Sequence, residues 1–122
     1  MGAMKLFNKS RGHEVAGEVR LARTFLERTL GLMGKKSMVE GSTLWIQGSR
    51  FIPCNSIHTC FMNFSIDAVF VDRELKVRAV YRDLKPWRMT APVRGAQSVF
   101  ELPGGTLSAS PVEVGDQLHV GA

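Results

Sequence analysis

The sequence predicts a single small α+β domain dominated by an antiparallel β-sheet that is strongly curved or closed into a barrel. Most apolar segments are short and alternate with polar residues or end at glycine or proline, which is typical of strands in antiparallel sheets. One segment alone, about residues 24–33, has a clear helical period. A length of 122 residues suits one domain, residues 1–122, with its own core. The first dozen residues, about 1–12, are expected to be flexible or in part added by cloning.

The first half of the chain predicts two strands around the helix. Residues 13–22, HEVAGEVRLA, alternate between apolar and charged positions, as expected of a strand. The period then changes. Thr24 and Glu27 have the spacing of a capping box, in which each side chain bonds the other's backbone N–H. Residues at i, i+4 and i+7 form one apolar stripe: Leu26, Leu30 and Met33. Residues 42–48, STLWIQG, are a short apolar strand ending at glycine.

The second half predicts a hairpin, a long loop and two further strands. Residues 66–71 are mostly apolar on both faces, as in a central strand, and after the turn DREL residues 75–82 alternate as a partly exposed partner. Residues 85–97 form a proline-punctuated loop. Residues 98–105 begin with a strand, and residues 117–120 are the last strand, after a connection with one helical turn.

Charge and composition restrict the classes of partner. The net charge of +5 and the pI near 9.7 suggest affinity for polyanions, but Lys and Arg are dispersed along the chain. We therefore expect weak, non-specific nucleic-acid binding at most. No apolar run has the roughly 18–20 residues needed for a membrane span, and no apolar stretch follows the basic residues of the first segment. Two cysteines predict no disulfide scaffold. The expected location is cytoplasmic, and an envelope location stays open if a signal or anchor has been removed.

Several motifs follow one another along the chain: Gly31-Leu32-Met33, His58-Thr59 with Met62, Ile66-Asp67 ahead of Phe70 and Asp72, Glu101-Leu102-Pro103 with Gly105, and Gly115-Asp116. From about Val19 to Val120, the chain resembles domain-of-unknown-function family 192, a family of small uncharacterised prokaryotic proteins. It departs from the family pattern at Cys60, where an aromatic residue is common, at Ser65, where proline is frequent, and in PGG, where PAG is usual. The resemblance implies a monomeric, β-rich, bacterial-type domain, and no established reaction, substrate or cofactor.

The segment CNSIHTCFMN, residues 54–63, is rich in groups that bind metals. If it is extended, one face carries Cys54, His58, Cys60 and Met62. Sulfur ligands beside an imidazole suit Cu(I) or Zn(II), but the cysteine spacing does not match that of compact zinc sites. We predict a core strand that presents His58, with both thiols free. A thiophilic metal site of Cys54, His58 and Cys60 is the less favoured alternative.

A catalytic interpretation depends on His58 and Asp67. A carboxylate beside a histidine fixes its tautomer and raises its basicity, so His58 could act as the base of a hydrolase-like enzyme with Asp67 orienting it. The structural interpretation is favoured: His58 as a hydrogen-bonded sheet residue and Asp67 as a clamp on backbone groups.

The loop after residue 84 offers a binding surface. Trp87 supplies a flat apolar group, and Lys85, Arg88 and Arg94 supply cations for an anionic partner. The alternative is that Trp87 plugs the open end of a barrel. Glu101 is a candidate partner for these arginines, because a buried glutamate is costly without one. The sequence favours a non-catalytic binding or accessory module, in which one patch holds a small anionic ligand or a protein segment: His58, Asp67, Trp87, Arg88, Arg94 and Glu101.

Overall fold

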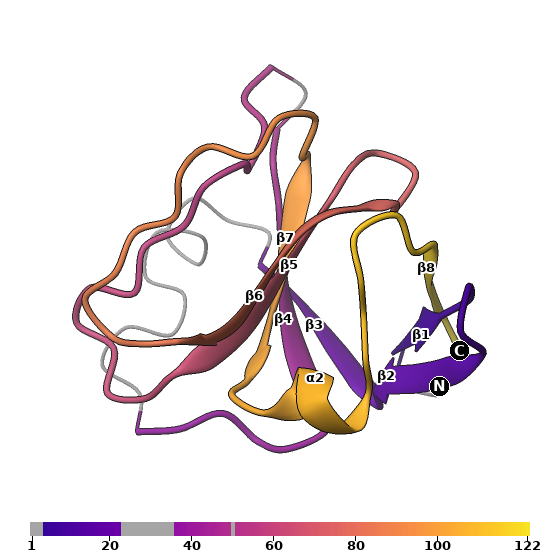
Figure 1. Cartoon of the computed structure of the whole chain (residues 1–122), viewed down its shortest axis with the longest axis horizontal. Coiled ribbons are helices and arrows are strands. Elements are labelled where there is room, and N and C mark those ends of the chain that lie inside the picture. Colours follow the sequence, from indigo (N-terminus) through magenta and orange to yellow (C-terminus); the bar gives the residue numbers. More distant parts are fainter. Residues whose placement is uncertain (1–3, 23–35, 50) are drawn as a thin grey trace.

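The structure, a computed structural model, describes residues 4–22, 36–49 and 51–122 (Figure 1). The helix predicted at about 24–33 lies outside the described residues. The elements are β1 (Lys5–Asn8), β2 (His13–Ala16), β3 (Glu18–Ala22), β4 (Ser42–Gln47), β5 (Ile66–Val71), β6 (Val77–Leu84), β7 (Ser98–Pro103), α2 (Thr106–Ala109) and β8 (Leu118–Gly121). The predicted small α+β domain, mostly strand, is confirmed.

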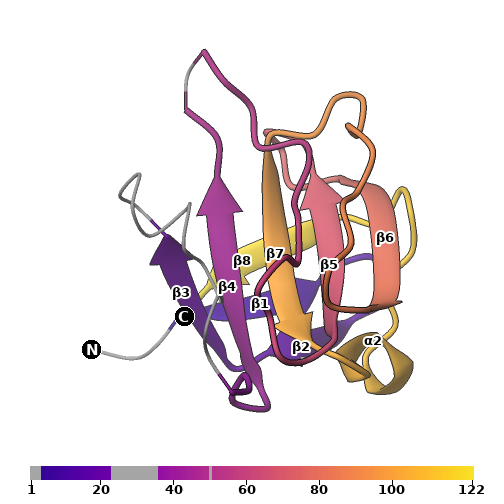
Figure 2. The ribbon, with the colours of Figure 1, turned by 90° about the vertical axis from the view of Figure 1, so that its left-hand side faces the viewer.

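The larger sheet has five strands in the order β3-β4-β7-β5-β6 (Figure 2). Its neighbouring strands are antiparallel except for β3 and β4, which are parallel. All six residues of β5 are buried, as expected for an apolar strand between β7 and β6. The predicted hairpin is present, with β6 as its more exposed strand.

The other strands form a second, smaller sheet in the order β2-β1-β8, which lies behind the large sheet in Figure 2. In the described residues the strands thus make two sheets and no closed barrel. One reason that the strands form two separate sheets is Gly17, which interrupts the predicted strand at residues 13–22. Its N–H donates to the carbonyl of Gly41 (2.7 Å) instead of to either sheet ladder. The chain before Gly17 joins the small sheet, and the chain after it joins the large one.

Two apolar cores lie on opposite faces of the large sheet. The inner core fills the space between the sheets, with Leu6, Val15 and Leu118 from the small sheet and Val69, Phe100 and Leu102 from the large one. The outer core covers the other face of the large sheet. It packs Ile66, Phe70 and Val99 of the sheet against Ile57, Met62 and Ala96 of two loops. These two loops, residues 51–65 and 85–97, run side by side along the left of Figure 1.

Candidate functional site

The segment CNSIHTCFMN is not a strand of either sheet, and the prediction of a core strand is wrong in this respect. It follows the loop at residues 87–93 in antiparallel fashion. The joining hydrogen bonds are Val93 N–H to Asn55 O (2.8 Å), Thr90 N–H to Ile57 O (2.9 Å) and Thr59 N–H to Arg88 O (2.8 Å). We call these paired segments the loop ribbon. Ile57 and Thr59 point into the protein, whereas His58 between them is exposed.

Thr59 is the main connection in the loop ribbon. It is fully buried, and its hydroxyl donates to the carbonyl of Lys85 (2.6 Å) and accepts from the N–H of Arg88 (2.8 Å). Its carbonyl accepts from the N–H groups of Trp87 (3.0 Å) and Met62 (3.2 Å). One side chain thereby fixes the backbone on both sides of Trp87.

Phe61 and Trp87 form an exposed aromatic pair on this ribbon. Their ring centroids are 4.7 Å apart at an interplanar angle of 59°, and each residue is 59% exposed. Both have left-handed backbone, with φ of 65° at Phe61 and 62° at Trp87. This conformation is strained for residues with a bulky side chain, at a cost of about 1–3 kcal/mol each. Trp87 is therefore exposed to solvent and does not plug the end of a barrel.

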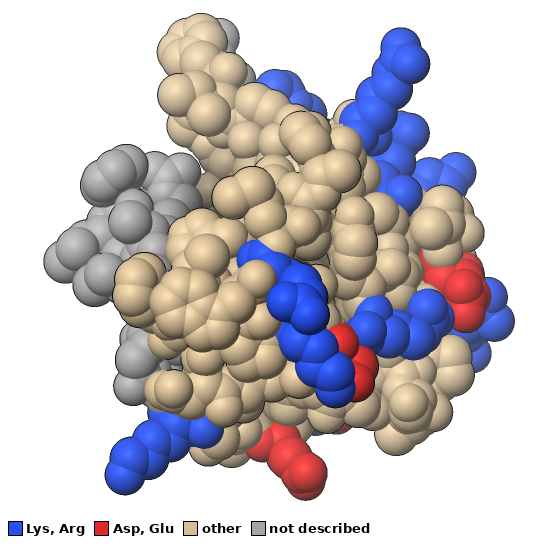
Figure 3. All heavy atoms as spheres, turned by 60° about the vertical axis from the view of Figure 1, so that its left-hand side comes forward, with Lys and Arg blue, Asp and Glu red and all other residues tan. Residues whose placement is uncertain are grey.

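Met89, 75% exposed, lies two residues after Trp87 on the same ribbon, where its backbone forms a bridge with His58. We call Phe61, Trp87 and Met89 the aromatic surface. Two exposed residues of the ribbon adjoin these in the chain or in the pairing: Arg88 stands between Trp87 and Met89, and His58 pairs with Met89. Lys85, two residues before Trp87, is paired with Asp83 (2.7 Å). These loops lie on the left-hand side of Figure 1, and Figure 3 shows that side turned toward the viewer. On that face Lys and Arg side chains outnumber Asp and Glu side chains.

His58 and Asp67 are not joined by any hydrogen bond among the described residues. The Nδ1 atom of His58 accepts from the N–H of Cys60 (3.2 Å). The two carboxylate oxygens of Asp67 accept from the N–H groups of Asp83 and Leu107, each at 2.8 Å. Asp67 is thus a buried clamp that ties the end of β6 and the start of α2 to β5.

Asp67 and Glu101 point to opposite faces of the large sheet. Asp67 is paired with Leu102 of the inner core, and Glu101 is paired with Ala68 of the outer core. The six residues of the predicted patch therefore divide. His58, Trp87 and Arg88 come together on the loop ribbon; Arg94 is exposed beyond the ribbon's last bond, whereas Asp67 and Glu101 are buried in separate layers.

Glu101 is 5% exposed, and burial raises the pKa of its carboxyl to about 7. Among the ion pairs of the described residues, none joins Glu101 to Arg88 or Arg94. Glu101 is therefore a buried acid that is neutral or partly ionised near neutral pH.

Cys54 and Cys60 are both half-buried, and neither forms a disulfide within the described residues. In the described ranges, no three His, Cys, Asp or Glu side chains are grouped so that they could hold a metal ion. The alternative site of Cys54, His58 and Cys60 gains no support from this arrangement.

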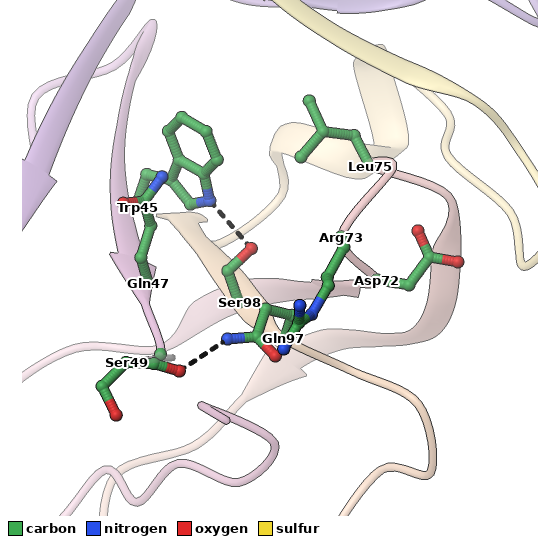
Figure 4. Close-up of a pocket in the computed structure, with 9 residues that line it drawn as sticks. Trp45, Gln47, Ser49, Asp72, Arg73, Leu75, Gln97 and Ser98 are labelled. Atoms are coloured by element: carbon green, nitrogen blue, oxygen red, sulfur yellow. Dashed lines mark hydrogen bonds between the residues drawn. The ribbon is translucent and has the colours of Figure 1, made fainter. Parts of the chain in front are cut away.

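A pocket of about 350 Å³ lies at the end of the large sheet where β4 ends and β7 begins (Figure 4). We call it the Trp45 pocket. It is lined by β4, the β5–β6 turn and the start of β7, through Trp45, Gln47, Gly48, Ser49, Asp72, Arg73, Leu75, Gln97 and Ser98. The indole of Trp45 stacks on Phe100 (centroids 5.0 Å apart, 17°), and its Nε1–H donates to Ser98 Oγ (2.9 Å).

Two charged residues of opposite sign line the Trp45 pocket. Burial opposes ionisation of the Asp72 carboxyl, but bonds from the N–H groups of Lys76 and Glu74 and from Arg78 outweigh it and lower the pKa. Asp72 is thus an anion whose charge is engaged by its own turn. Arg73 is exposed and takes part in no ion pair among the described residues.

Sequence reasoning missed the Trp45 pocket. Its residues come from three segments that are far apart in the chain, and they meet only because β7 lies between β4 and β5. A signal was present in STLWIQG, where a tryptophan and a glutamine stand at the end of a strand. The turn DREL was interpreted only as a turn.

The family model of domain-of-unknown-function family 192, described as "Uncharacterized ACR", matches residues 6–120. This chain belongs to that family. The UPF0127 protein of Pyrococcus furiosus is 36% identical over 114 residues, which cover 93% of this chain and 96% of the relative. The UPF0127 protein of Thermococcus sibiricus is 35% identical over 113 residues, or 93% of this chain and 72% of the relative. The resemblance inferred from the motifs is confirmed, and these relatives carry no assigned activity in their names.

Two solved structures share the fold of this family member. A protein of unknown function from Novosphingobium aromaticivorans has a TM-score of 0.77 at 22% identity, covering 95% of this chain and 82% of the other. A candidate transcription regulator from Sinorhizobium meliloti has a TM-score of 0.78 at 23% identity, covering 96% and 91%. At these identities the likeness shows the fold alone. In the described part of the chain, no helix has both the length and the apolarity to span a bilayer.

Proposed function

We propose that this protein is a non-catalytic binding module that engages a short segment of a partner protein through the aromatic surface. The observation that carries the proposal is the contact between Phe61 and Trp87, two exposed aromatic residues held in left-handed backbone. Strained residues persist only where their surroundings hold them, and they cluster at functional sites. Burial does not account for the strain here, because most of each side chain faces solvent.

The size of the aromatic surface supports a short partner segment. An aromatic side chain buries about 150–250 Å² when fully covered, so two rings and a methionine supply less than the roughly 800 Å² per partner of a standard interface. A folded partner domain would need additional contact area. A segment with one or two apolar anchor residues needs no more than this surface.

The charge around the aromatic surface favours an acidic segment. Arg88 and His58 border the apolar area, and the whole chain carries a net charge of +5. Aromatic residues and arginine contribute most of the binding free energy at typical interfaces. We therefore expect the partner to combine an apolar or proline anchor with Asp or Glu beside it.

Selection from a random peptide library tests this proposal. Peptides enriched on the wild-type protein are expected to bind with affinities that fall at least about tenfold in Trp87→Gly and Phe61→Gly. Glycine is chosen because it removes the ring and accepts the left-handed backbone. Val114→Ala, which trims an exposed apolar side chain far along the chain from the ribbon, is the matched control.

The outcome separates two cases. Affinity lost in both glycine variants and retained in Val114→Ala supports the aromatic surface as the binding site. No enrichment of any peptide, or equal affinity for the wild type and Trp87→Gly, contradicts the proposal. Thermal unfolding of each variant shows whether the fold is retained.

A further inference from the structure

We infer that the Trp45 pocket binds a single sugar ring that carries an anionic group, either a carboxylate or a phosphate. This site is separate from the aromatic surface, because none of the residues of one belongs to the other. The inference therefore does not depend on the proposed partner segment.

The pocket's dimensions set the size of the ligand. Its volume of about 350 Å³ is near the lower limit of the roughly 300–1,000 Å³ typical of small-molecule sites. A nucleotide or a longer glycan would extend well beyond it. One ring with a single substituent group suits this volume.

Trp45 and Leu75 form the apolar part of the pocket and are fixed before any ligand arrives. Phe100 covers one face of the indole, and Ser98 holds its N–H. Leu75 has left-handed backbone (φ 64°), and its carbonyl is bound by the N–H of Leu118 (2.9 Å). A preorganised apolar wall reduces the entropy lost on binding, and the C–H face of a sugar packs on such a wall.

Arg73 supplies the positive charge. In Figure 4 its side chain extends toward the side of the pocket that Gln97 lines, whereas the Asp72 carboxylate points away from Gln97 and Ser98. The Asp72 charge is taken up by Arg78 (3.1 Å) and by backbone N–H groups. A guanidinium without a carboxylate partner in the described residues is left to receive an anion, by two parallel bonds to a carboxylate or a phosphate.

The remaining wall is polar, which distinguishes a sugar from an aromatic acid. The side chains of Gln47, Ser49, Gln97 and Ser98 surround the pocket. Gln97 uses one N–H on the carbonyl of Ser49 (3.0 Å), so its amide is held in place while its oxygen and second N–H can meet ligand hydroxyls. An aromatic acid offers no hydroxyls to the oxygen and second N–H of Gln97, and these groups would lose water without a replacement partner.

Fluorescence of a Trp87→Phe protein tests the inference, because Trp45 is then the single tryptophan of the chain. The probes are glucuronate, glucose 6-phosphate and neutral glucose. At least one anionic sugar is expected to change the Trp45 emission saturably and to bind at least about tenfold more tightly than glucose. The two anionic probes distinguish a carboxylate from a phosphate source.

A second variant identifies the charged group. Arg73→Gln, in the same background, is expected to weaken binding of the anionic sugar about tenfold and to leave glucose binding unchanged. Arg20→Gln, at an exposed position of β3 outside the pocket, is the matched control. The inference is overturned if neither anion saturates by about 10 mM, if glucose binds equally well, or if Arg73→Gln binds the anion as tightly as the control. Because Trp87 is absent throughout, this result is independent of peptide binding to the aromatic surface.

Discussion

The rings of Phe61 and Trp87 lie 4.7 Å apart, although neither residue belongs to a strand or a helix. Regular secondary structure does not hold them in place. The buried Thr59 does so, by bonds to the backbone on both sides of Trp87 and to Met62 directly after Phe61. The aromatic surface therefore depends on one buried residue, through its hydroxyl and its carbonyl, and on two residues held in an unfavourable conformation.

The backbone strain at Phe61 predicts an unusual response to glycine. Phe61→Gly is expected to be more stable than Phe61→Ala by about 1 kcal/mol, since only alanine retains the left-handed penalty of an L-residue. At Met89, which is not among the described residues with positive φ, glycine is expected to be less stable than alanine by about 0.5–1 kcal/mol. Urea unfolding of the four variants measures both differences. Equal stability of the two Phe61 variants would show that Phe61 is not strained in solution.

Removal of the Thr59 hydroxyl is expected to loosen the loop ribbon. Thr59→Val keeps the shape of the side chain but loses the bonds to the Lys85 carbonyl and the Arg88 N–H. Because both groups lie against a fully buried residue, the expected loss is about 1–3 kcal/mol of unfolding free energy. Thr59→Ser, which retains the hydroxyl, is the control and should lose less. Amide hydrogen exchange at Trp87 and Arg88 should accelerate in Thr59→Val alone, and unchanged exchange would contradict this role.

The large sheet shows which features a sequence of this kind makes predictable. Residues 66–71 are apolar at every position except Asp67, and a strand of that composition is expected to be buried on both faces wherever it lies. The turn and the exposed alternation of β6 follow from local pattern as well. The order of the strands does not, because β7 enters between β4 and β5 through contacts between segments far apart in the chain. The Trp45 pocket results from that order, which explains why no local motif indicated it.

The candidate site residues show the same limit of prediction from local sequence. His58, Trp87 and Arg88 were expected on one surface, and the two loops that carry them pair directly. Asp67 and Glu101 have comparable motif support, but strand alternation sends them to opposite faces of the sheet. Chemistry and spacing can select a residue type, whereas the face it occupies depends on register.

Asp67 is expected to act through the backbone groups that it binds. In Asp67→Asn one side-chain oxygen remains for two donors, the N–H groups of Asp83 and Leu107. The new amide NH2 group then faces one of these donors and cannot accept its hydrogen bond. The expected cost is about 1–3 kcal/mol, measured by urea unfolding, because a buried donor loses its acceptor. Asp83→Asn is the control: its exposed carboxylate bonds Lys85 and the Ser65 hydroxyl near the surface, so little change is expected. A stability of Asp67→Asn equal to that of the control would contradict the clamp.

The buried carboxyl of Glu101 links stability to pH. Its pKa rises from an ordinary value of 4.5 in the unfolded chain to about 7 in the folded protein. Between these values the folded state holds a proton that the unfolded state has released. The contribution of this group to the free energy of unfolding is therefore greatest below pH 4.5. It falls by up to about 1.4 kcal/mol per pH unit as the pH rises toward 7.

Glu101→Gln replaces the titrating group with a neutral one of similar shape and is expected to flatten this dependence. The variant should gain stability relative to the wild type as pH rises from 5 to 8, by about 3 kcal/mol at most. Urea unfolding at intervals across this range measures the difference, and the same series with Glu14→Gln, an exposed glutamate of β2, gives the control slope. A constant difference between Glu101→Gln and the wild type at all pH values would mean that the carboxyl is ionised in the fold. In that case a cation or a set of donors must hold it, and the outer core would contain a charge pair rather than a neutral acid.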